Sequence, residues 1–251
     1  MCKNREKKHI FAPQFKFIMK KVLLFCFLAL TAVGAYAQSY AKGRFLVEGD
    51  YTRTAGFEPS CVFAFDFRNS NEHGFTLGYK VGPDKHFINL AYQIALVEDW
   101  NEKGLFYLEN RYLYRRFTAY GLQEFNGMLS LGYRNIHWNF KLGLCNRYIA
   151  EVPLRLDGGM GTIFEPMNVV FDIQYHLFGE NHPWNIGAGI SNQREFIIER
   201  VTLFYYTLNG YYDIDDHWRI LGEAGLHPSG VLNLSSQYNG YFINLGFTYQ
   251  R

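Results

Sequence analysis

Hydrophobic side chains alternate with a strict period of two in this chain, and residues His86–Val97 show the pattern most clearly. One face of this segment carries Ile88, Leu90, Tyr92, Ile94 and Leu96, and the other carries Phe87, Asn89, Ala91, Gln93 and Ala95. A period of two is typical of a β-strand, here with one apolar face and one mixed, mostly small or polar face. The segment also has the length of roughly ten residues that a tilted strand needs to cross a bilayer.

Similar segments follow one another to the end of the chain, and turn-forming residues separate them. The alternation predicts twelve strands, at about Gly43–Thr52, Ser60–Arg68, His73–Val81, His86–Val97, Leu105–Arg116, Phe125–Tyr133, Ile136–Arg147, Met167–Leu177, Trp184–Ser191, within Phe196–Asn209, His217–Leu226 and Gly240–Tyr249. The tenth has the weakest alternation, and the sequence leaves its register open. Residues 151–166 and 227–238 are predicted as the two longest loops.

The first 37 residues have the organisation of an export signal. Met19-Lys20-Lys21 is a positively charged start, Val22–Val33 is an apolar core, and Ala35-Tyr36-Ala37 is a small-residue cleavage site. We predict a Sec signal peptide cleaved before Gln38, preceded by an upstream extension. A long positively charged start is the alternative to that extension. Residues 1–37 are therefore expected to be removed, and residues 38–251 to form one domain.

The charge balance changes once the signal peptide is set aside. Residues 1–37 hold seven of the 25 Lys and Arg and one of the 23 acidic residues, so 18 basic and 22 acidic residues remain. No basic patch suggests a nucleic-acid partner. Cys61 and Cys145 fall on opposite faces of their predicted strands, which argues against a disulfide and against a metal-ligand cluster. No cofactor is expected.

Long alternating strands in an exported chain fit either a soluble β-sandwich or a membrane β-barrel. The predicted strands are longer than the average of about 5–6 residues in globular proteins. Their apolar faces are nearly free of charge, and a Lys or Arg facing the lipid midplane would cost about 2–4 kcal/mol. These features favour an all-β fold, a single antiparallel up-and-down transmembrane β-barrel of about twelve strands.

The other faces carry charges in mid-strand, as expected of residues that line a barrel lumen. By alternation the lumen-lining residues are Arg44, Glu48, Asp50, Asp66, Arg68, Lys80, Glu109, Arg111, Arg115, Lys141, Arg147, Asp172, Arg219 and Glu223. This set predicts a mildly cationic pore for small polar or anionic solutes. The alternative is that the charges pair and plug the interior, because twelve strands lie between filled barrels of about 8 strands and open channels of about 16–18.

The four tryptophans share one position in the predicted topology. Trp100, Trp138, Trp184 and Trp218 lie in or beside the turns after the fourth, sixth, eighth and tenth strands, which open on one side of the membrane. A tryptophan row at one edge is typical of a membrane-interface girdle, and chance placement is the alternative. If the N-terminus starts in the periplasm, these turns are periplasmic and the two long loops are extracellular.

Over the whole mature chain the pattern resembles a small outer-membrane β-barrel protein of a Gram-negative bacterium. The resemblance implies an outer-membrane location, contact with outer-membrane lipids and lipopolysaccharide, and the barrel-assembly machinery as a partner during biogenesis. We expect a passive channel for small polar solutes or a structural envelope component rather than an enzyme. A barrel subunit of a larger envelope complex is a further alternative.

One short motif leaves an enzymatic alternative. Leu226-His227-Pro228-Ser229-Gly230 follows the eleventh strand, and its His-x-Ser pair resembles the catalytic arrangement of outer-membrane lipid A deacylases. In that arrangement His227 would be the base for Ser229, and Glu223 is the nearby carboxylate available to orient the histidine. The competing explanation is a loop with ordinary turn chemistry.

Overall fold

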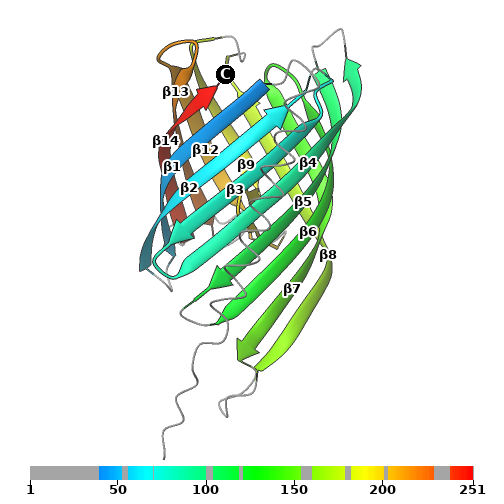
Figure 1. Ribbon diagram of the computed structural model, residues 1–251, viewed down its shortest axis with the longest axis vertical. Coiled ribbons are helices and arrows are strands. Elements are labelled where there is room, and N and C mark those ends of the chain that lie inside the picture. Colours follow the sequence, from blue (N-terminus) through cyan, green and yellow to red (C-terminus); the bar gives the residue numbers. More distant parts are fainter. Residues whose placement is uncertain are drawn as a thin grey trace, which may run out of the picture. The chain divides into compact units, whose positions relative to one another are not determined.

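The computed structural model describes residues 40–250 apart from 53–55, 70, 100–103, 119–120, 154–159, 179–181, 201–202 and 229–237. In this part of the chain, twelve antiparallel strands close into a barrel (Figure 1). They are β1 (Tyr40–Thr52), β2 (Gly56–Arg68), β3 (Gly74–Gly82), β4 (Lys85–Asp99), β5 (Gly104–Phe117), β6 (Leu122–Arg134), β7 (Trp138–Pro153), β8 (Met160–His176), β9 (Trp184–Ser191), β12 (Tyr205–Asp213), β13 (Trp218–Pro228) and β14 (Tyr238–Gln250). The predicted all-β up-and-down barrel is confirmed.

Each barrel strand pairs with its neighbour in the chain, with β12 following β9, and the first strand closes the barrel against the last. That closing pair runs in register from Lys42↔Gln250 to Thr52↔Gly240. A closed barrel leaves no strand edge along the paired length, which is what a sheet in lipid requires. Within the described ranges no helix is both long and apolar enough to cross a membrane.

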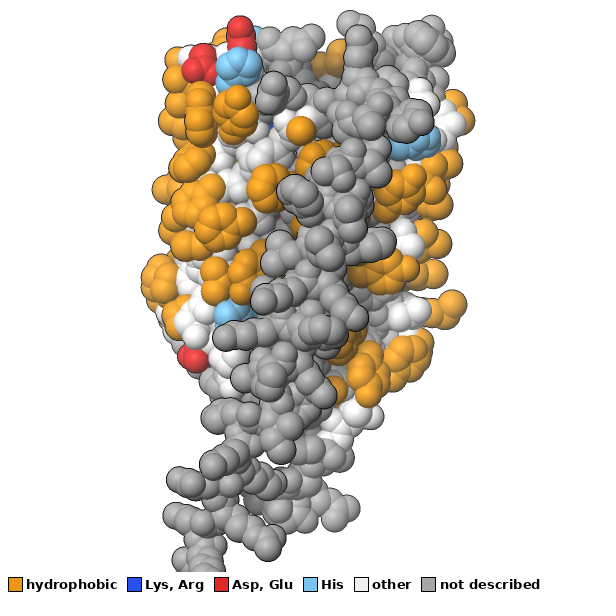
Figure 2. Space-filling view, in the orientation of Figure 1, with side chains coloured by type: hydrophobic (Ala, Val, Ile, Leu, Met, Phe, Trp, Pro, Cys, Tyr) orange, Lys and Arg blue, Asp and Glu red, His pale blue; other side chains and the backbone are white. Residues whose placement is uncertain are grey.

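The alternation in the sequence becomes an outward apolar face and an inward polar face. On β7, Trp138, Phe140, Leu142 and Leu144 are exposed on the outside, while Cys145 is buried inside. Figure 2 shows hydrophobic side chains over the described surface of one face of the barrel, with acidic side chains only near its ends. This outer surface is the one that a bilayer would cover.

The barrel has two rims, and successive strands begin at opposite rims because they alternate in direction. We call the end where β1 begins and β14 ends the near rim, and the opposite end the far rim. Trp138, Trp184 and Trp218 are exposed at the near rim, each at the first residue of its strand. Trp100, the fourth residue of the predicted girdle, lies outside the described residues.

Two near-rim turns share one construction. Oδ1 of Asn135 accepts hydrogen bonds from the backbone N–H groups of His137, at 3.0 Å, and Trp138, at 2.7 Å. Asp215 makes the same pair of contacts, from the N–H groups two and three residues later, both at 2.7 Å. Such Asx-type contacts satisfy backbone donors that the turn would otherwise leave unpaired. These two donors also hold the pKa of Asp215 below its usual range.

The loop predicted at 151–166 is shorter than expected. The β7–β8 hairpin continues to Pro153 and Met160, well past the predicted strand ends, and extends beyond its neighbours in Figure 1. The register between β7 and β8 shifts between Cys145↔Asn168 and Arg147↔Glu165, so β8 carries a bulge, and Met167 there has a positive φ of 57°. Pro166 cannot donate to the ladder, which fits its place beside the bulge. The loop was predicted from the glycine-rich run at 157–161, and the strand nevertheless begins at Met160. The other predicted loop, 227–238, lies mostly outside the described residues.

The predicted tenth strand is the main correction to the topology. The wall strand in this region is β12, from Tyr205, and it pairs with β9 from Tyr205↔Ser191 to Tyr212↔Trp184. The preceding residues form a separate two-stranded hairpin, β10 (Gln193–Arg194) and β11 (Ile197–Ile198), that is not part of the barrel wall. The predicted tenth strand therefore combined residues of an internal hairpin with residues of a wall strand, and this explains its weak alternation.

Candidate functional site

The hairpin begins where β9 leaves the barrel wall. Ser191 and Tyr205 are register partners, so residues 192–204 depart from and return to one point of the wall. Asn192, fully buried, fixes the departure: its side-chain amide donates to the carbonyl oxygens of Val169, at 2.8 Å, and Glu199, at 3.1 Å. Its Oδ1 accepts from the backbone N–H of Phe171 at 2.7 Å. One side chain thus ties both ends of the hairpin to β8. We call residues 192–204 the inner loop.

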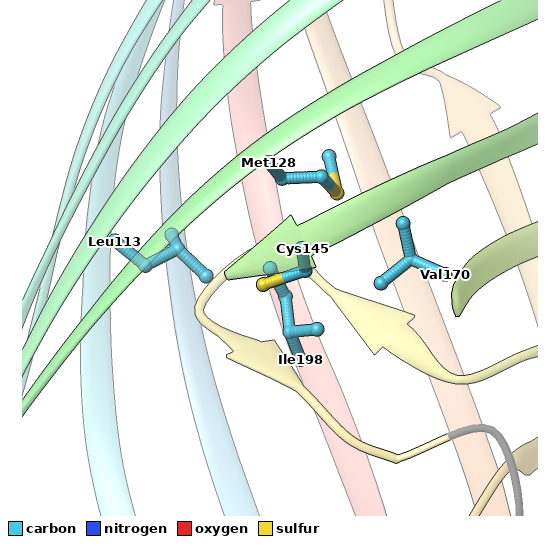
Figure 3. Close-up of a cluster of buried hydrophobic side chains, with 5 residues drawn as sticks. All are labelled: Leu113, Met128, Cys145, Val170 and Ile198. Atoms are coloured by element: carbon cyan, nitrogen blue, oxygen red, sulfur yellow. The ribbon is translucent and has the colours of Figure 1, made fainter. Parts of the chain in front are cut away.

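Apolar contacts fix the second strand of the inner loop inside the barrel. Ile198 packs with Leu113, Met128, Cys145 and Val170, which come from β5, β6, β7 and β8 (Figure 3). All five side chains are almost completely buried. Burying an aliphatic side chain of this size contributes about 1.5–3 kcal/mol.

The tip of the inner loop reaches a different part of the wall. Phe196 packs with Leu46, Val62 and Phe87. It also lies over Gly78 of β3, where an added Cβ atom would come within 2.8 Å of the Phe196 ring. The tip therefore fits a hollow that exists because this wall position has no side chain.

Charged contacts add a third attachment. The Arg194 guanidinium pairs with Glu48 at 2.5 Å and with Asp50 at 2.9 Å. Lys80 binds the same two carboxylates, and Lys85 also contacts Asp50, at 3.3 Å. Arg194 additionally lies over the Phe242 ring, 3.3 Å from its centroid. Buried pairs of this kind cost desolvation, so they specify the position of the loop more than they stabilise the fold.

The neighbouring loop residue makes a second ion pair with the wall. Both carboxylate oxygens of Glu195 accept from Arg44, at 2.9 and 3.1 Å, and Arg44 also pairs with Asp66 at 3.0 Å. Such two-point contacts are stronger and more directional than single hydrogen bonds. A separate pairing on the wall joins Glu109 to Lys141 at 3.0 Å and to Arg111 at 2.9 Å.

On the far-rim side of the inner loop a further set of charges is paired. Glu124 binds Arg115 at 3.1 Å and Arg147 at 3.2 Å. Arg147 also donates to the carbonyl oxygen of Ile198, and Glu165 binds both Arg147, at 3.4 Å, and Arg200. The inner loop is thus held on both sides by wall charges.

A cavity of about 410 Å³ lies between the inner loop and the near rim. Loop residues 193–197 form one boundary, and the near-rim halves of the wall strands supply residues such as Asp66, Gln93 and Asn139. Its charged lining residues are Arg44, Arg68, Lys80, Arg111, Arg134, Lys141 and Arg194, against Glu48, Asp66, Glu109, Asp172, Glu195 and Glu223. The two signs nearly balance, so the cavity is polar without a strong net charge.

Several polar atoms that line this cavity have no hydrogen-bond partner among the described protein residues. They belong to Asn89, Gln93, Arg111, Gln193 and Asn244. Asn89 is completely buried, and both polar atoms of its amide are unpaired by protein. A buried amide without any partner costs about 1–3 kcal/mol, so these groups require water or a polar solute.

The structure places all fourteen residues of the predicted lumen set inside the barrel. Twelve make ion pairs, including Arg68 with Glu72 at 3.6 Å and Arg219 with Asp213 at 2.5 Å. The other two accept amide hydrogen bonds: Asp172 from Gln174 at 2.9 Å, and Glu223 from Asn244 at 3.2 Å. The charged residues of the predicted set are thus largely paired with one another in this interior.

The sequence reasoning missed two groups of interior charges. The first group lies on strands that were predicted too short, and extending each strand by a few residues would have found its members. They are Glu58, Lys85, Glu124 and Arg134. Residues of the inner loop, above all Arg194, had no such signal, because their segment looked like part of a wall strand.

The structure does not bring Glu223 close to His227, as the enzymatic alternative requires. Glu223 and His227 are four residues apart on β13, which separates them by about 13 Å along the strand. Glu223 lines the cavity and accepts a hydrogen bond from Asn244, whereas the His227 ring lies tilted against the Tyr205 ring, with 4.9 Å between their centroids. Ser229 lies outside the described residues. Among the described residues no group of His, Cys, Asp and Glu has the arrangement of a metal site, and Cys61 and Cys145 are free thiols.

Comparisons with known proteins agree with this architecture. No protein-family model matches the sequence, and no curated protein matches it either. Among solved structures, the KdgM porin in complex with disordered oligogalacturonate is similar over 83% of this chain and 98% of its own, at 10% identity and a TM-score of 0.51. The NanC porin matches at 12% identity over 82% and 98%, with a TM-score of 0.49, and outer membrane phospholipase A from Escherichia coli at 10% over 83% and 89%, with 0.48. At such low identity the likeness to the KdgM porin, with a TM-score of 0.51, shows the fold alone, a closed outer-membrane-type β-barrel.

Proposed function

We propose that this protein is a passive outer-membrane channel for small polar solutes, in which the inner loop forms the constriction. The observation that carries the proposal is the polar cavity of about 410 Å³ beneath the loop, with its unpaired buried amides. A barrel whose role was only structural would gain by filling this space with apolar side chains. The near balance of basic and acidic lining residues favours neutral, zwitterionic or weakly anionic solutes.

The proposal includes the location and route of the chain. Residues 1–37 direct Sec export, the near rim with its tryptophans faces the periplasm, and the far rim faces the outside. The inner loop then enters the lumen from the extracellular side. This orientation takes the N-terminus to start in the periplasm, and the strand parity then places the three exposed tryptophans of the near rim at the periplasmic interface.

Single-channel recording in planar bilayers tests the proposal. Because Ser191 and Tyr205 face each other, a short turn can replace residues 192–204 without altering the wall strands. We expect small, discrete conductance steps from the wild-type protein and a several-fold larger conductance from the shortened variant. Shortening residues 229–237 instead is the matched control, since it leaves the inner loop intact.

The outcomes separate the possible roles. Conductance in the shortened variant together with a silent wild type would make the inner loop a plug of a latent channel. Silence of both proteins, with both still folded by their heat-dependent gel migration, would overturn the channel function. A structural role or membership of a larger envelope complex would then be the better explanation.

A further inference from the structure

One arginine on the barrel wall does not follow the rule that its charges face inward. On β5, Phe106 and Tyr112 point outward and are exposed, whereas Arg115 points inward to Glu124. Arg116 follows Arg115 and therefore points outward. The other Lys and Arg on the described strands of the barrel face the interior, namely Lys42, Arg44, Arg68, Lys80, Lys85, Arg111, Arg115, Arg134, Lys141, Arg147 and Arg219.

Arg116 has no protein partner to explain its position. Within the described part of the chain it makes no ion pair or hydrogen bond, and its Nε is buried. Its register neighbours are His86 on β4 and Gln123 on β6, neither of which is acidic. His86 is engaged with the Tyr79 hydroxyl at 2.7 Å, and Gln123 accepts from Tyr114 at 3.0 Å. A partly buried guanidinium with uncharged neighbours lacks its counter-anion.

The position of Arg116 along the strand suggests where that anion comes from. It is the last residue but one of β5, at the far rim. An outward Arg costs several kcal/mol at the lipid midplane but only about 0–1 kcal/mol near the interface. Lipid phosphate groups lie at that level, and a guanidinium matches a phosphate with two parallel hydrogen bonds.

An apolar groove begins directly below this arginine, toward the middle of the barrel wall. It has a volume of about 400 Å³ and is almost entirely apolar. Its walls include Tyr112, Tyr114, Phe125, Tyr148 and Phe164, with Gly127 among its lining residues. Tyr114 lies one outward position below Arg116, a step of roughly 7 Å along the strand.

The depth of the groove depends on one glycine. Gly127 interrupts an outward row of large side chains on β6, between Phe125 and Leu129, both of which are exposed. A Cβ added at Gly127 would touch only the Tyr112 ring, at 3.8 Å, which is an ordinary contact. The packing of the barrel does not therefore require glycine here, and its effect is to leave the groove open between aromatic walls.

We propose that Arg116 and this groove form a binding site for one lipid A molecule of the outer leaflet. A phosphate group of the lipid pairs with the Arg116 guanidinium, and one acyl chain lies in the groove over Gly127. The charge of the arginine selects a phosphorylated headgroup, and the apolar groove stabilises the bound chain by burying its surface. The site lies outside the barrel and does not depend on conduction. It rests only on the proposed orientation, which places the far rim in the outer leaflet.

Native mass spectrometry of the purified protein in detergent tests the site. The protein is titrated with diphosphoryl lipid A and, separately, with phosphatidylglycerol and phosphatidylethanolamine. We expect one retained lipid A per barrel. Arg116→Gln and Gly127→Leu should each weaken it by about tenfold or more, the first by removing a charge-assisted contact and the second by filling the groove.

Two matched controls separate the site from general effects on the barrel. Arg68→Gln makes the same change of charge inside the lumen, and Gly43→Leu fills an outward glycine near the other rim, where an added Cβ meets only Phe65 at 3.7 Å. Both should retain wild-type lipid A binding, and all four variants should keep the heat-dependent gel migration of the folded barrel. Equal retention of phosphatidylglycerol and lipid A, or unchanged binding in Arg116→Gln, would overturn the proposal. Neither result bears on the conductance of the protein.

Discussion

The Phe196 ring lies over Gly78, so close that a Cβ atom at residue 78 would come within 2.8 Å of the ring. Gly78 belongs to the wall strand β3, and Phe196 belongs to the tip of the inner loop. The contact makes this small wall position one of the points that seat the loop in the lumen. It also offers a way to displace the loop without changing any residue of the loop itself.

Gly78→Val is expected to unseat the inner loop. The backbone at residue 78 has an ordinary φ, and valine suits a strand, so the wall itself should tolerate the change. Overpacking against Phe196 costs about 1–3 kcal/mol, which falls on the docking of the loop. The readout is thiol labelling of Cys145, which is buried against Ile198 in the wild type, in a Cys61→Ser background. Labelling should become faster, and conductance larger.

Gly43→Val is the control for that substitution, because residue 43 faces outward and an added Cβ there meets nothing closer than 3.7 Å. Its Cys145 labelling should match the wild type. If Gly78→Val also labels at the wild-type rate while remaining folded, the inner loop is not held by the Phe196 contact.

Arg194→Gln tests the charged attachment of the same loop. The change removes the guanidinium from Glu48 and Asp50 but leaves Lys80 between them. Lys80 keeps both carboxylates partly compensated, so the loss falls mainly on the attachment of the inner loop to the wall. Faster Cys145 labelling is expected, and adding Glu48→Gln to the variant should restore part of the protection. Additive losses in the double variant would show that the two groups do not act on each other.

Glu109→Gln should make the channel more selective for anions. Glu109 is the shared partner of Lys141, at 3.0 Å, and Arg111, at 2.9 Å, and all three line the cavity. Neutralising the carboxylate leaves two cations uncompensated beside the solute path. The reversal potential in a KCl gradient, measured at low salt where screening is weak, should move toward the chloride value. Lys141→Met is expected to move it the other way, and equal shifts in both variants would contradict this account.

The barrel was predictable from the sequence because lipid and lumen impose opposite chemistry on alternate residues. The orientation of β4 follows from three residues, with Ile88 and Leu90 on the outer side and Asn89 on the inner side. The same reasoning placed Lys141 and Glu109 inside the barrel. Boundaries were less accurate where the ladder is irregular. At Met167 a bulge after Pro166 breaks the alternation, although the strand continues to Met160.

The inner loop could not be predicted in the same way. Its turn, at Glu195 and Phe196, contains none of the residues that usually mark a two-residue hairpin. Its apolar side chains, such as Ile198, face other apolar side chains inside the barrel, and a sequence pattern does not distinguish that environment from lipid. The near-rim turns were different: Asn135-x-His137-Trp138 and Asp215-x-His217-Trp218 have one spacing, which could have indicated their shared geometry.

That shared geometry leads to a prediction about pH. The N–H groups of His217 and Trp218 favour the charged form of Asp215 and lower its pKa. Because the pKa of Asp215 is lower in the folded state, its carboxylate contributes fully to stability above the ordinary aspartate pKa of about 3.9. This contribution is lost as the pH falls through the lowered pKa of the folded state. The free energy of unfolding of the wild type, measured in urea, should therefore fall in strong acid, partly because of this turn.

Asp215→Asn should remove that acid-dependent part while keeping the acceptor oxygen, as Asn135 does in the equivalent turn. The reciprocal variant, Asn135→Asp, should add a second acid-sensitive turn beside Trp138. Identical acid dependence in the wild type and both variants would mean that these turns do not contribute to the stability of the near rim.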